Sequence, residues 1–185
     1  LLNGQRIRAL TVVDNFSRYC HAIRVGKSIR GMDVVEVMKA LKQQNKEVKK
    51  RIQVDNGSEF ISKEFDKWAY DNKVVLDYSR PGKPTDNPFI ESFNGSFRDE
   101  CLNVNWFLSL EDAYEKISTW MTEYNDFRPH SSLNEMTPAE FIENFRSEEK
   151  KKKALPGASV DESMYFASAE HSPAASENTY IPQQR

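Results

Sequence analysis

The first half of the chain alternates between short β-like runs and longer segments with helical periodicity. Residues 7–14 are rich in β-branched side chains, residues 15–18 are turn formers, and residues 19–25 resume an apolar, strand-like pattern. This pattern predicts a β-hairpin with a loop of about four residues. Further short strands are expected at 51–54 and 74–78. Strands that alternate with helices predict an α/β fold class.

Helices are expected where apolar residues recur at the spacing of one helix face. This spacing is found in Val34, Val37, Met38 and Leu41, and further helices are expected over 62–71, over 89–102, from Ser109 onward and from Thr137 to about Arg146. The side chains expected to face the interior are Phe65, Trp68, Ala69, Ala113, Ile117, Trp120, Met121 and Tyr124.

Two of these helices begin with a sequence that resembles a capping box. One is Ser109-Leu110-Glu111-Asp112 and the other is Thr137-Pro138-Ala139-Glu140. In a capping box the first side chain bonds a free backbone N–H of the helix start, and the acidic side chain reaches back to the cap. Proline also suits the first helical position. The second sequence is the stronger helix-start signal.

The composition changes at Ser147, where Glu148-Glu149 and four lysines lead into a stretch of Ala, Ser, Pro and Glu with few large apolar side chains. We interpret residues 1–146 as one core domain and residues 147–185 as a disordered tail. The chain begins with Leu in what resembles a strand already in progress. We therefore expect it to be a fragment of a longer protein.

Charge is distributed unevenly along the chain, although the net charge is only −2. Residues 1–51 hold twelve Lys and Arg against four Asp and Glu, whereas residues 52–146 hold nine against eighteen. A basic half beside an acidic half suits a protein that binds a polyanion on one surface, although two solvated faces would give the same pattern. The sequence has neither an apolar run of membrane-spanning length nor an export leader. We expect a cytoplasmic protein with no membrane partner, whose two cysteines, Cys20 and Cys101, are buried free thiols.

Asp55 and Glu91 are the candidate metal ligands. Asp55 ends an expected strand and precedes Asn-Gly, whereas Glu91 follows a proline-containing loop and opens a helix. Each has a simpler explanation, since Asp can cap a turn and Glu is favoured at a helix N-terminus. Together they suggest a site for Mg²⁺, which prefers oxygen ligands. Two such ions about 4 Å apart can activate an attacking oxygen and stabilise a leaving one on a DNA phosphodiester.

Basic and polar residues near these acids are candidate DNA contacts. Arg98 lies seven positions, two helical turns, beyond Glu91 and is placed to clamp a phosphate, unless it only pairs with Asp99 or Glu100. The weaker candidates are Arg80 and Lys83 in the proline-rich loop, Asn94 in the helix, and Arg128 and His130 in a later segment. A structural, hydrogen-bonding role is the alternative for His130.

The segments Val54–Phe60, Ile90–Gly95, Arg98–Asn103, Tyr124-Asn125 and Arg128–Leu133 together closely resemble the integrase core of bacterial insertion-sequence transposases, relatives of retroviral integrases. The resemblance covers about residues 5–146. It implies a ribonuclease H-like fold, in which helices flank a mixed five-stranded sheet, and a site of two Asp and one Glu. The family places 35 residues between its second Asp and its Glu, as between Asp55 and Glu91. Arg98 matches the family's basic residue seven positions after the Glu.

One feature of the family is missing from this chain. The family's first catalytic Asp lies on the first strand of its sheet, upstream of the segment that resembles Leu10–Arg18. Asp14 is a weaker substitute, because it matches a hairpin position on the second strand. The resemblance therefore implies a transposase core with both its first strand and its first Asp missing. Loss of that strand also leaves neighbouring strand edges exposed.

We accordingly expect a DDE-type transposase core with little or no strand-transfer activity. The intact family site holds two Mg²⁺ or Mn²⁺ ions, and the implied partners are DNA, as element ends and target, and further copies of the protein on that DNA. The implied location is the bacterial cytoplasm, on the nucleoid when DNA is bound. The alternatives are a non-catalytic DNA-binding or interaction remnant of a transposase and, more weakly, a structure-selective nuclease of the same fold.

Overall fold

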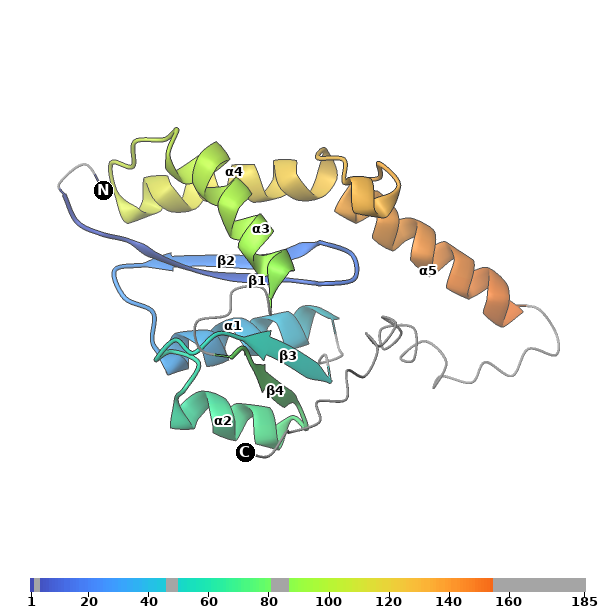
Figure 1. The fold of residues 1–185 in the computed structure, drawn as a ribbon, viewed down its shortest axis with the longest axis horizontal. Coiled ribbons are helices and arrows are strands. Elements are labelled where there is room, and N and C mark those ends of the chain that lie inside the picture. The colour runs from blue at the N-terminus through green and yellow to red at the C-terminus, as the bar shows by residue number, and fades with distance from the viewer. Residues whose placement is uncertain (2–3, 46–49, 81–86, 155–185) are drawn as a thin grey trace, which may run out of the picture. The chain divides into compact units, whose positions relative to one another are not determined.

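The computed structural model describes residues 1, 4–45, 50–80 and 87–154, and it separates the chain into two units, 1–144 and 145–185. The elements run in chain order (Figure 1): β1 (Arg8–Val13), β2 (Cys20–Gly26), α1 (Gly31–Asn45), β3 (Arg51–Val54), α2 (Lys63–Asp71), β4 (Val75–Tyr78), α3 (Pro88–Phe97), the π-helix η2 (Arg98–Leu102), α4 (Leu110–Asp126), the 3₁₀-helix η3 (Ser131–Leu133) and α5 (Pro138–Ala154). The expected alternation of strands and helices is confirmed.

The first two strands form the expected hairpin. β1 pairs antiparallel with β2, from Arg8 opposite Gly26 to Val12 opposite Ala22, with a shift in register before Val13. The turn is closed by two backbone hydrogen bonds. The Asp14 N–H donates to the Tyr19 carbonyl at 2.9 Å, and the Arg18 N–H donates to the Asp14 carbonyl at 2.8 Å.

The other two strands pair in parallel through a helical crossover. β3 and β4 are aligned from Arg51 opposite Val75 to Val54 opposite Tyr78, and α2 connects them. Parallel neighbours require such a crossover, since a tight turn cannot reverse the chain twice. In the part of the chain that the structure describes, the four strands form two separate pairs, β1–β2 and β3–β4.

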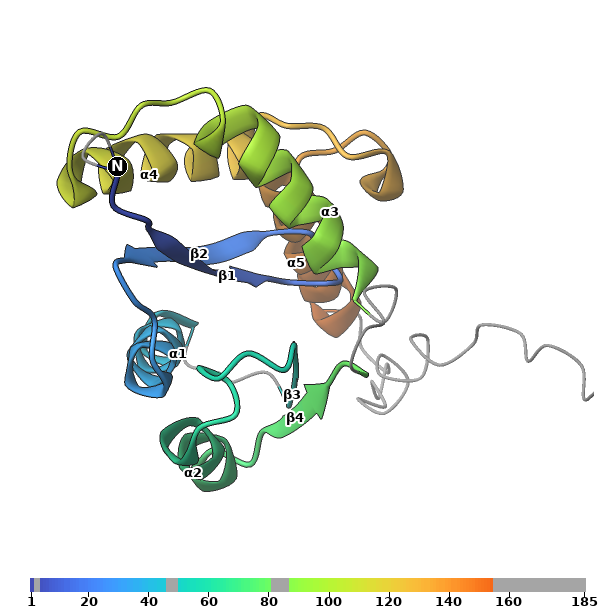
Figure 2. The ribbon, with the colours of Figure 1, turned by 60° about the vertical axis from the view of Figure 1, so that its left-hand side comes forward.

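Two hydrophobic clusters fill the interior of the first unit, and the hairpin contributes to both. One cluster joins Leu10 of β1 to α1, α2 and β3; its buried residues include Val34, Val35, Val37, Met38, Val54, Phe65, Trp68 and Ala69. The other joins Cys20 and Ile23 of β2 to the later helices; it includes Phe93, Phe97, Cys101, Ala113, Ile117, Trp120 and Tyr124. Figure 2 shows α1 on one side of the hairpin and α3 with α4 on the other.

The interior positions expected from helical spacing are confirmed, with one difference of degree. Phe65, Trp68 and Ala69 are buried, as are the four α4 residues Ala113, Ile117, Trp120 and Tyr124, whereas Met121 is only partly buried. The aromatic members contact each other closely. The Phe93 ring lies edge-on to Tyr124 at a centroid distance of 4.9 Å, a geometry that ring quadrupoles favour. Both thiols are buried and free, as expected.

The helix starts have the caps that the sequence predicts. The Ser109 hydroxyl accepts from the Asp112 N–H at 3.2 Å. At the start of α5 the Thr137 hydroxyl accepts from the Glu140 N–H at 3.2 Å, and the Glu140 carboxylate accepts from the Thr137 N–H at 2.9 Å. This is the reciprocal arrangement of a capping box, which satisfies donors that the helix leaves without an internal partner.

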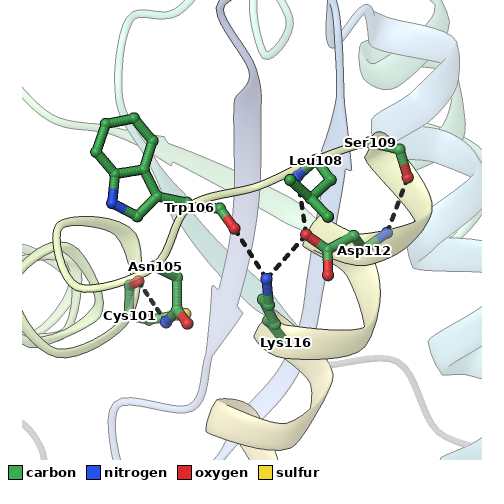
Figure 3. A network of polar contacts seen from close by, with 7 residues as sticks. All are labelled: Cys101, Asn105, Trp106, Leu108, Ser109, Asp112 and Lys116. Atoms are coloured by element: carbon green, nitrogen blue, oxygen red, sulfur yellow. Dashed lines mark hydrogen bonds and ion pairs between the residues drawn. The ribbon is translucent and has the colours of Figure 1, made fainter. Parts of the chain in front are cut away.

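A polar network fixes the connection between η2 and α4 (Figure 3). The Lys116 ammonium donates to the Trp106 carbonyl at 2.8 Å and to the Asp112 carboxylate at 2.9 Å. That carboxylate also accepts from the Leu108 N–H at 2.8 Å. Trp106 is 77% exposed while the adjacent Phe107 is buried, so the connection packs one ring inward and holds the other in solvent.

Two local expectations were incomplete. The helix expected to end near Arg146 continues as α5 to Ala154, because Glu and Lys are good helix formers and Glu148 precedes Lys152 at a favourable spacing. The helix expected over 89–102 changes at Arg98 into a π-helical turn. The tail interpretation for 147–185 stays a prediction for residues 155–185, which lie outside the described residues. No described helix is long and apolar enough to span a membrane.

Candidate active site

Asp55 follows the last residue of β3, where the chain turns. One carboxylate oxygen, Oδ1, accepts from the Gly57 N–H at 2.8 Å, and the neighbouring Asn56 amide donates to the Ser79 carbonyl at 2.7 Å. The interpretation of Asp55 as a turn cap is therefore correct. It does not exclude a second role, because the side chain is exposed and a carboxylate has four acceptor positions.

The glycine after Asp55-Asn56 leaves space beside two carboxylates. A Cβ on Gly57 would lie 2.9 Å from Asp55 Oδ1 and 3.0 Å from an oxygen of the Glu59 carboxylate. Two acidic side chains thus lie close to the same point, and the absence of a side chain at Gly57 leaves room for both. Glu59 is a neighbour of Asp55 that the sequence motif contains but that the spacing argument did not single out.

Glu91 lies in the first turn of α3, exposed to solvent. Pro88 occupies the first helical position, and the Glu91 N–H donates to the Asn87 carbonyl at 3.3 Å. A negative charge in this turn interacts favourably with the helix dipole. The structure thus places both candidate ligands at the ends of elements, with their carboxylates in solvent.

The described part of the chain contains no cluster of potential metal ligands around Asp55 or Glu91. None of the described Asp, Glu, His or Cys residues forms a group of three or more that could hold a metal ion. Asp14 is engaged within its own turn, since its Oδ1 accepts from the Phe16 N–H at 3.3 Å and its Oδ2 accepts from the Ser17 hydroxyl at 2.9 Å. Asp14 thus stabilises the hairpin turn.

Arg98 stands at the junction of α3 and η2, two turns beyond Glu91, and is exposed. The alternative in which it only pairs with an adjacent acid gains no support, since Glu100 pairs instead with Arg128. The hydrogen bond from Arg128 is the main reason that the pKa of the Glu100 carboxyl lies below its usual value. Among the described residues, no salt bridge involves Arg98.

The weaker candidate DNA contacts have different environments. Asn94 is half-buried, and its side-chain carbonyl accepts from the Thr11 hydroxyl of β1 at 3.1 Å, so it ties α3 to the hairpin. Arg80 follows β4 and is exposed. Lys83 lies outside the described residues.

Arg128 and His130 pack around Tyr124. The guanidinium carbon of Arg128 is 5.8 Å from the Tyr124 ring centre, and the imidazole of His130 lies 5.1 Å from it, edge-on. The pKa of His130 is lowered, first by burial and then by the positive charges of Arg128 and Arg18. A neutral imidazole is the consequence near pH 7. This environment disfavours a charged phosphate contact. The hydrogen-bonding role expected as the alternative is not seen at Nε2 of His130, which is buried without a hydrogen-bond partner among the described residues.

Two residues outside the sequence-based candidates contact the elements that carry the acids. The Arg18 guanidinium lies over the Phe89 ring, and the Asn15 amide reaches Gln53. No periodicity or motif spacing indicates these contacts, since each joins positions far apart in the sequence. They depend on how the hairpin turn is placed in the fold.

Comparisons with known proteins agree with this fold. Two family models, both described as Integrase core domain, match residues 1–84 and 72–138. The chain therefore belongs to the integrase core domain family, which includes transposases and retroviral integrases.

Among its relatives, an uncharacterized 31.7 kDa protein of insertion element IS407 from Burkholderia multivorans is 44% identical over 147 residues, covering 80% of this chain and 53% of the relative. An uncharacterized 39.2 kDa protein of IS476 from Xanthomonas euvesicatoria is 42% identical, covering 80% and 43%. The chain thus spans about half the length of these relatives.

Solved structures show the same fold at low sequence identity. The catalytic core of bovine immunodeficiency virus (BIV) integrase matches with a TM-score of 0.55 at 14% identity, covering 77% of this chain and 96% of that core. An HTLV-2 integrase catalytic core in complex with magnesium matches with a TM-score of 0.51 at 14% identity, covering 74% and 91%. A simian T-cell lymphotropic virus intasome chain gives 0.59 at 13%, covering 94% and 58%. The fold is that of integrase catalytic cores, which is ribonuclease H-like.

Proposed function

We propose that this chain is the core of a DNA transposase, whose complete form cuts and joins DNA strands with divalent metal ions. The observation that carries the proposal is the placement of three side chains on an integrase-core fold. Asp55 follows the end of β3, Glu91 lies in the first turn of α3, and Arg98 follows two turns later, all exposed. Insertion-element relatives and integrase-core neighbours support this reaction class.

The side chains fit a hard divalent cation. Carboxylate oxygens are the ligands that Mg²⁺ and Mn²⁺ prefer, and the structural neighbour from HTLV-2 is described in complex with magnesium. Asp55 and Glu91 would each supply an oxygen, and the Asp55 turn already orients its carboxylate through the Gly57 N–H. A pair of bound ions would activate the attacking oxygen and stabilise the leaving oxygen. Arg98 would bind the phosphate and hold the DNA strand in place.

We infer that the strand-transfer activity of this chain is low or absent. No group of three ligating side chains occurs among the described residues. The described strands also form two separate pairs, where the family has one sheet. Both observations support the inferred loss of activity.

DNA is the partner that follows from this proposal, as element ends and target. Relatives from insertion elements support it, and the likeness to an intasome chain supports assembly of several copies on the DNA. Arg80, Lys83, Asn94, Arg98 and Arg128 are the proposed contacts, with His130 in a supporting, uncharged role. A bacterial cytoplasmic location, on the nucleoid when DNA is bound, goes with this function.

A non-catalytic DNA-binding remnant is the second candidate. It is favoured by one specific observation, the absence of a three-ligand group among the described residues. Such a protein would bind DNA through its basic residues and would show no metal-dependent chemistry. The two candidates make opposite predictions for metal binding.

Metal titration by calorimetry separates them. The wild-type chain is expected to bind Mn²⁺, and Asp55→Asn is expected to weaken that binding. Asp77→Asn is the matched control, since Asp77 is an exposed acid on the adjacent strand that pairs with Arg51 at 3.6 Å. Equal affinity in all three proteins would contradict the metal site and favour the remnant.

Cleavage and joining of labelled element-end DNA with Mg²⁺ or Mn²⁺ tests the inferred loss of activity. Robust strand transfer that Asp14→Asn abolishes would show that Asp14 replaces the missing Asp. Hydrolysis without joining would identify a nuclease of the same fold.

A further inference from the structure

The turn between β1 and β2 contacts both elements that carry the candidate metal ligands. On one side the Asn15 side-chain amide donates a long hydrogen bond, 3.4 Å, to the Gln53 side-chain carbonyl of β3, two residues before Asp55. On the other side the Arg18 guanidinium carbon lies 3.5 Å from the centre of the Phe89 ring. Phe89 lies in the first turn of α3, two residues before Glu91. One short turn thus reaches toward both acids.

The turn is internally fixed. The Asp14 carboxylate accepts from the Phe16 N–H and from the Ser17 hydroxyl, and Ser17 is only 1% exposed. Arg18 has a φ of 60°, in the left-handed region that costs free energy for a residue with a side chain. The surrounding contacts hold this conformation. It directs the guanidinium toward α3.

Residues of η3 and α5 also contact the turn. The Arg18 Nε donates to the Ser132 hydroxyl of η3 at 3.5 Å, near the distance limit. The Phe16 ring meets the Phe141 ring edge-on at a centroid distance of 5.2 Å. The guanidinium is therefore held between an aromatic ring and a hydroxyl. A cation in contact with a ring face is stabilised by the ring quadrupole, more so when it is partly removed from water.

We propose that Arg18, assisted by Asn15, is a positioning residue that fixes the first turn of α3 relative to the end of β3. Its function is to hold Glu91 and Asp55 at the spacing that a divalent cation requires. The role of the acids rests on the proposed function, whereas the positioning itself is a property of the fold. Asp14 supports this positioning, because its carboxylate accepts the hydrogen bonds that shape the turn.

The alternative anchor of α3 acts farther along the helix. Thr11 of β1 donates to Asn94, one turn after Glu91, and Phe93 and Phe97 are buried against α4. These contacts fix the body of the helix. In the first turn, which carries Glu91, Ile90 packs against the second cluster, whereas Phe89 is held against the hairpin turn by Arg18. Removing Arg18 should therefore loosen the first turn while the rest of α3 remains packed.

A distance measurement tests the positioning without metal. Spin labels on Ser58→Cys and Ser92→Cys, both exposed and close to the two acids, report the separation by double electron–electron resonance. The native thiols, Cys20 and Cys101, are buried and should remain unlabelled. The doubly labelled chain should give one narrow distance peak, and Arg18→Ala should lose it in favour of a broad distribution. Phe89→Leu, which removes the ring but keeps an apolar side chain, should broaden it similarly.

Two controls make the result specific. Arg18→Lys keeps a cation near the Phe89 ring and should restore most of the narrow peak. Arg24→Ala removes a comparable half-exposed arginine that pairs with Asp33 at 2.6 Å and Glu36 at 2.8 Å, far in sequence from either acid, and should leave the peak unchanged. A narrow peak in both Arg18→Ala and Phe89→Leu would overturn the proposal. So would equal broadening by Arg24→Ala, since it would indicate general loosening.

Metal affinity provides the second readout. Changes in residues that orient ligands typically weaken metal binding by about 10-fold or more, so Arg18→Ala should lower Mn²⁺ affinity by about that factor while Arg24→Ala leaves it unchanged. Failure of the proposed function would appear differently. If the wild type shows no Mn²⁺ binding that depends on Asp55, the metal site is refuted, and the distance measurement alone still decides whether Arg18 positions α3.

Discussion

Asn125 joins α4 to β2 through a pair of hydrogen bonds to the backbone of Cys20. Its side-chain carbonyl accepts from the Cys20 N–H and its amide donates to the Cys20 carbonyl, both at 2.9 Å. Asn125 is only 4% exposed. The side chain thus substitutes for a neighbouring strand at one position of β2. This explains the asparagine in the Tyr124-Asn125 motif without a contact to DNA.

Replacing Asn125 with alanine should lower the free energy of unfolding by about 3 kcal/mol, because a buried donor and a buried acceptor would lose their partners. Urea denaturation of Asn125→Ala measures the change. Asn103→Ala is the control, since Asn103 is exposed and its side-chain amide donates a long bond, 3.4 Å, to Asp99. Similar losses in the two variants would show that the Cys20 pairing is not the cause.

Substitution of Gly57 should affect metal binding more than stability. The added Cβ of Gly57→Ala would displace the Asp55 and Glu59 carboxylates, which lie within 3.0 Å of it. Both are ends of flexible side chains, so the fold should adapt with a loss of about 1 kcal/mol or less. Mn²⁺ affinity should fall, as measured by calorimetry.

Gly95→Ala provides the opposite control. A Cβ at Gly95 would meet nothing within 4 Å, and Gly95 lies inside α3, where alanine is favoured over glycine by about 0.5–1 kcal/mol. This variant should unfold at higher urea concentration and bind Mn²⁺ as the wild type does. Undiminished binding in Gly57→Ala would show that the Asp55 carboxylate does not need its present position.

Stability should decrease on mild acidification because of His130. Burial and two neighbouring arginines lower its pKa in the folded chain, so near pH 6 the unfolded chain binds more protons than the native one. The free energy of unfolding should therefore fall as the pH decreases through about 6.5, the ordinary histidine value, and stop falling for this reason below the native pKa. His130→Gln should show a weaker dependence between about pH 7.5 and pH 5.5.

The contribution of the Glu100 carboxyl to the pH dependence of stability falls outside the pH range in which His130 titrates. The pKa of Glu100 is already below its usual value of 4.5, chiefly through its hydrogen bond from Arg128, so the stability it contributes is lost only under more acidic conditions. Urea titrations of the wild type and His130→Gln at the two pH values would measure the difference. Parallel pH curves for the two proteins would contradict a buried, neutral His130.

Both thiols should resist modification in the native chain. Burial raises the pKa of Cys20 to about 12 and that of Cys101 to about 11, and the thiolate is the reactive form. Ellman's reagent at about pH 8 should react slowly with the folded protein and quickly with both thiols in urea. Fast reaction of a folded Ser92→Cys variant, whose new thiol is exposed, shows that the reagent is competent. Rapid native labelling of either wild-type cysteine would contradict the packing of the second cluster.

Local features of the fold could be predicted because each depends on residues close together in sequence. The hairpin, the Ser109 cap and the Thr137–Glu140 capping box are of this kind. Asp55 and Glu91 could also be singled out, since their spacing and flanking motifs resemble a family. The end of α5 was missed, because favourable helix formers continued the helix past the change in composition.

Contacts between distant positions could not be predicted. Asn125 and Cys20 are 105 positions apart, and Arg18 and Ser132 are 114 apart; neither pair has a periodicity or a motif that links its members. Asp14 illustrates the same limit. The sequence offered Asp14 only as a weaker substitute for the family's first Asp, and it did not indicate that the carboxylate accepts from Phe16 and Ser17 within the turn. The residue type and sequence position of an aspartate therefore do not show which groups donate hydrogen bonds to its carboxylate.

The hairpin contributes buried residues to both hydrophobic clusters, Leu10 to the first and Cys20 and Ile23 to the second. Amide hydrogens exchange with solvent only when a cooperative unit opens. Those of β1 and β2 should exchange only when both clusters open, whereas β3 and β4 depend on the first cluster alone. Hydrogen exchange followed by mass spectrometry should therefore find the slowest amides in the hairpin. The segment from β3 through α2 to β4 would then unfold before the hairpin. Asp55, which follows β3, would leave the proposed site before Glu91 does.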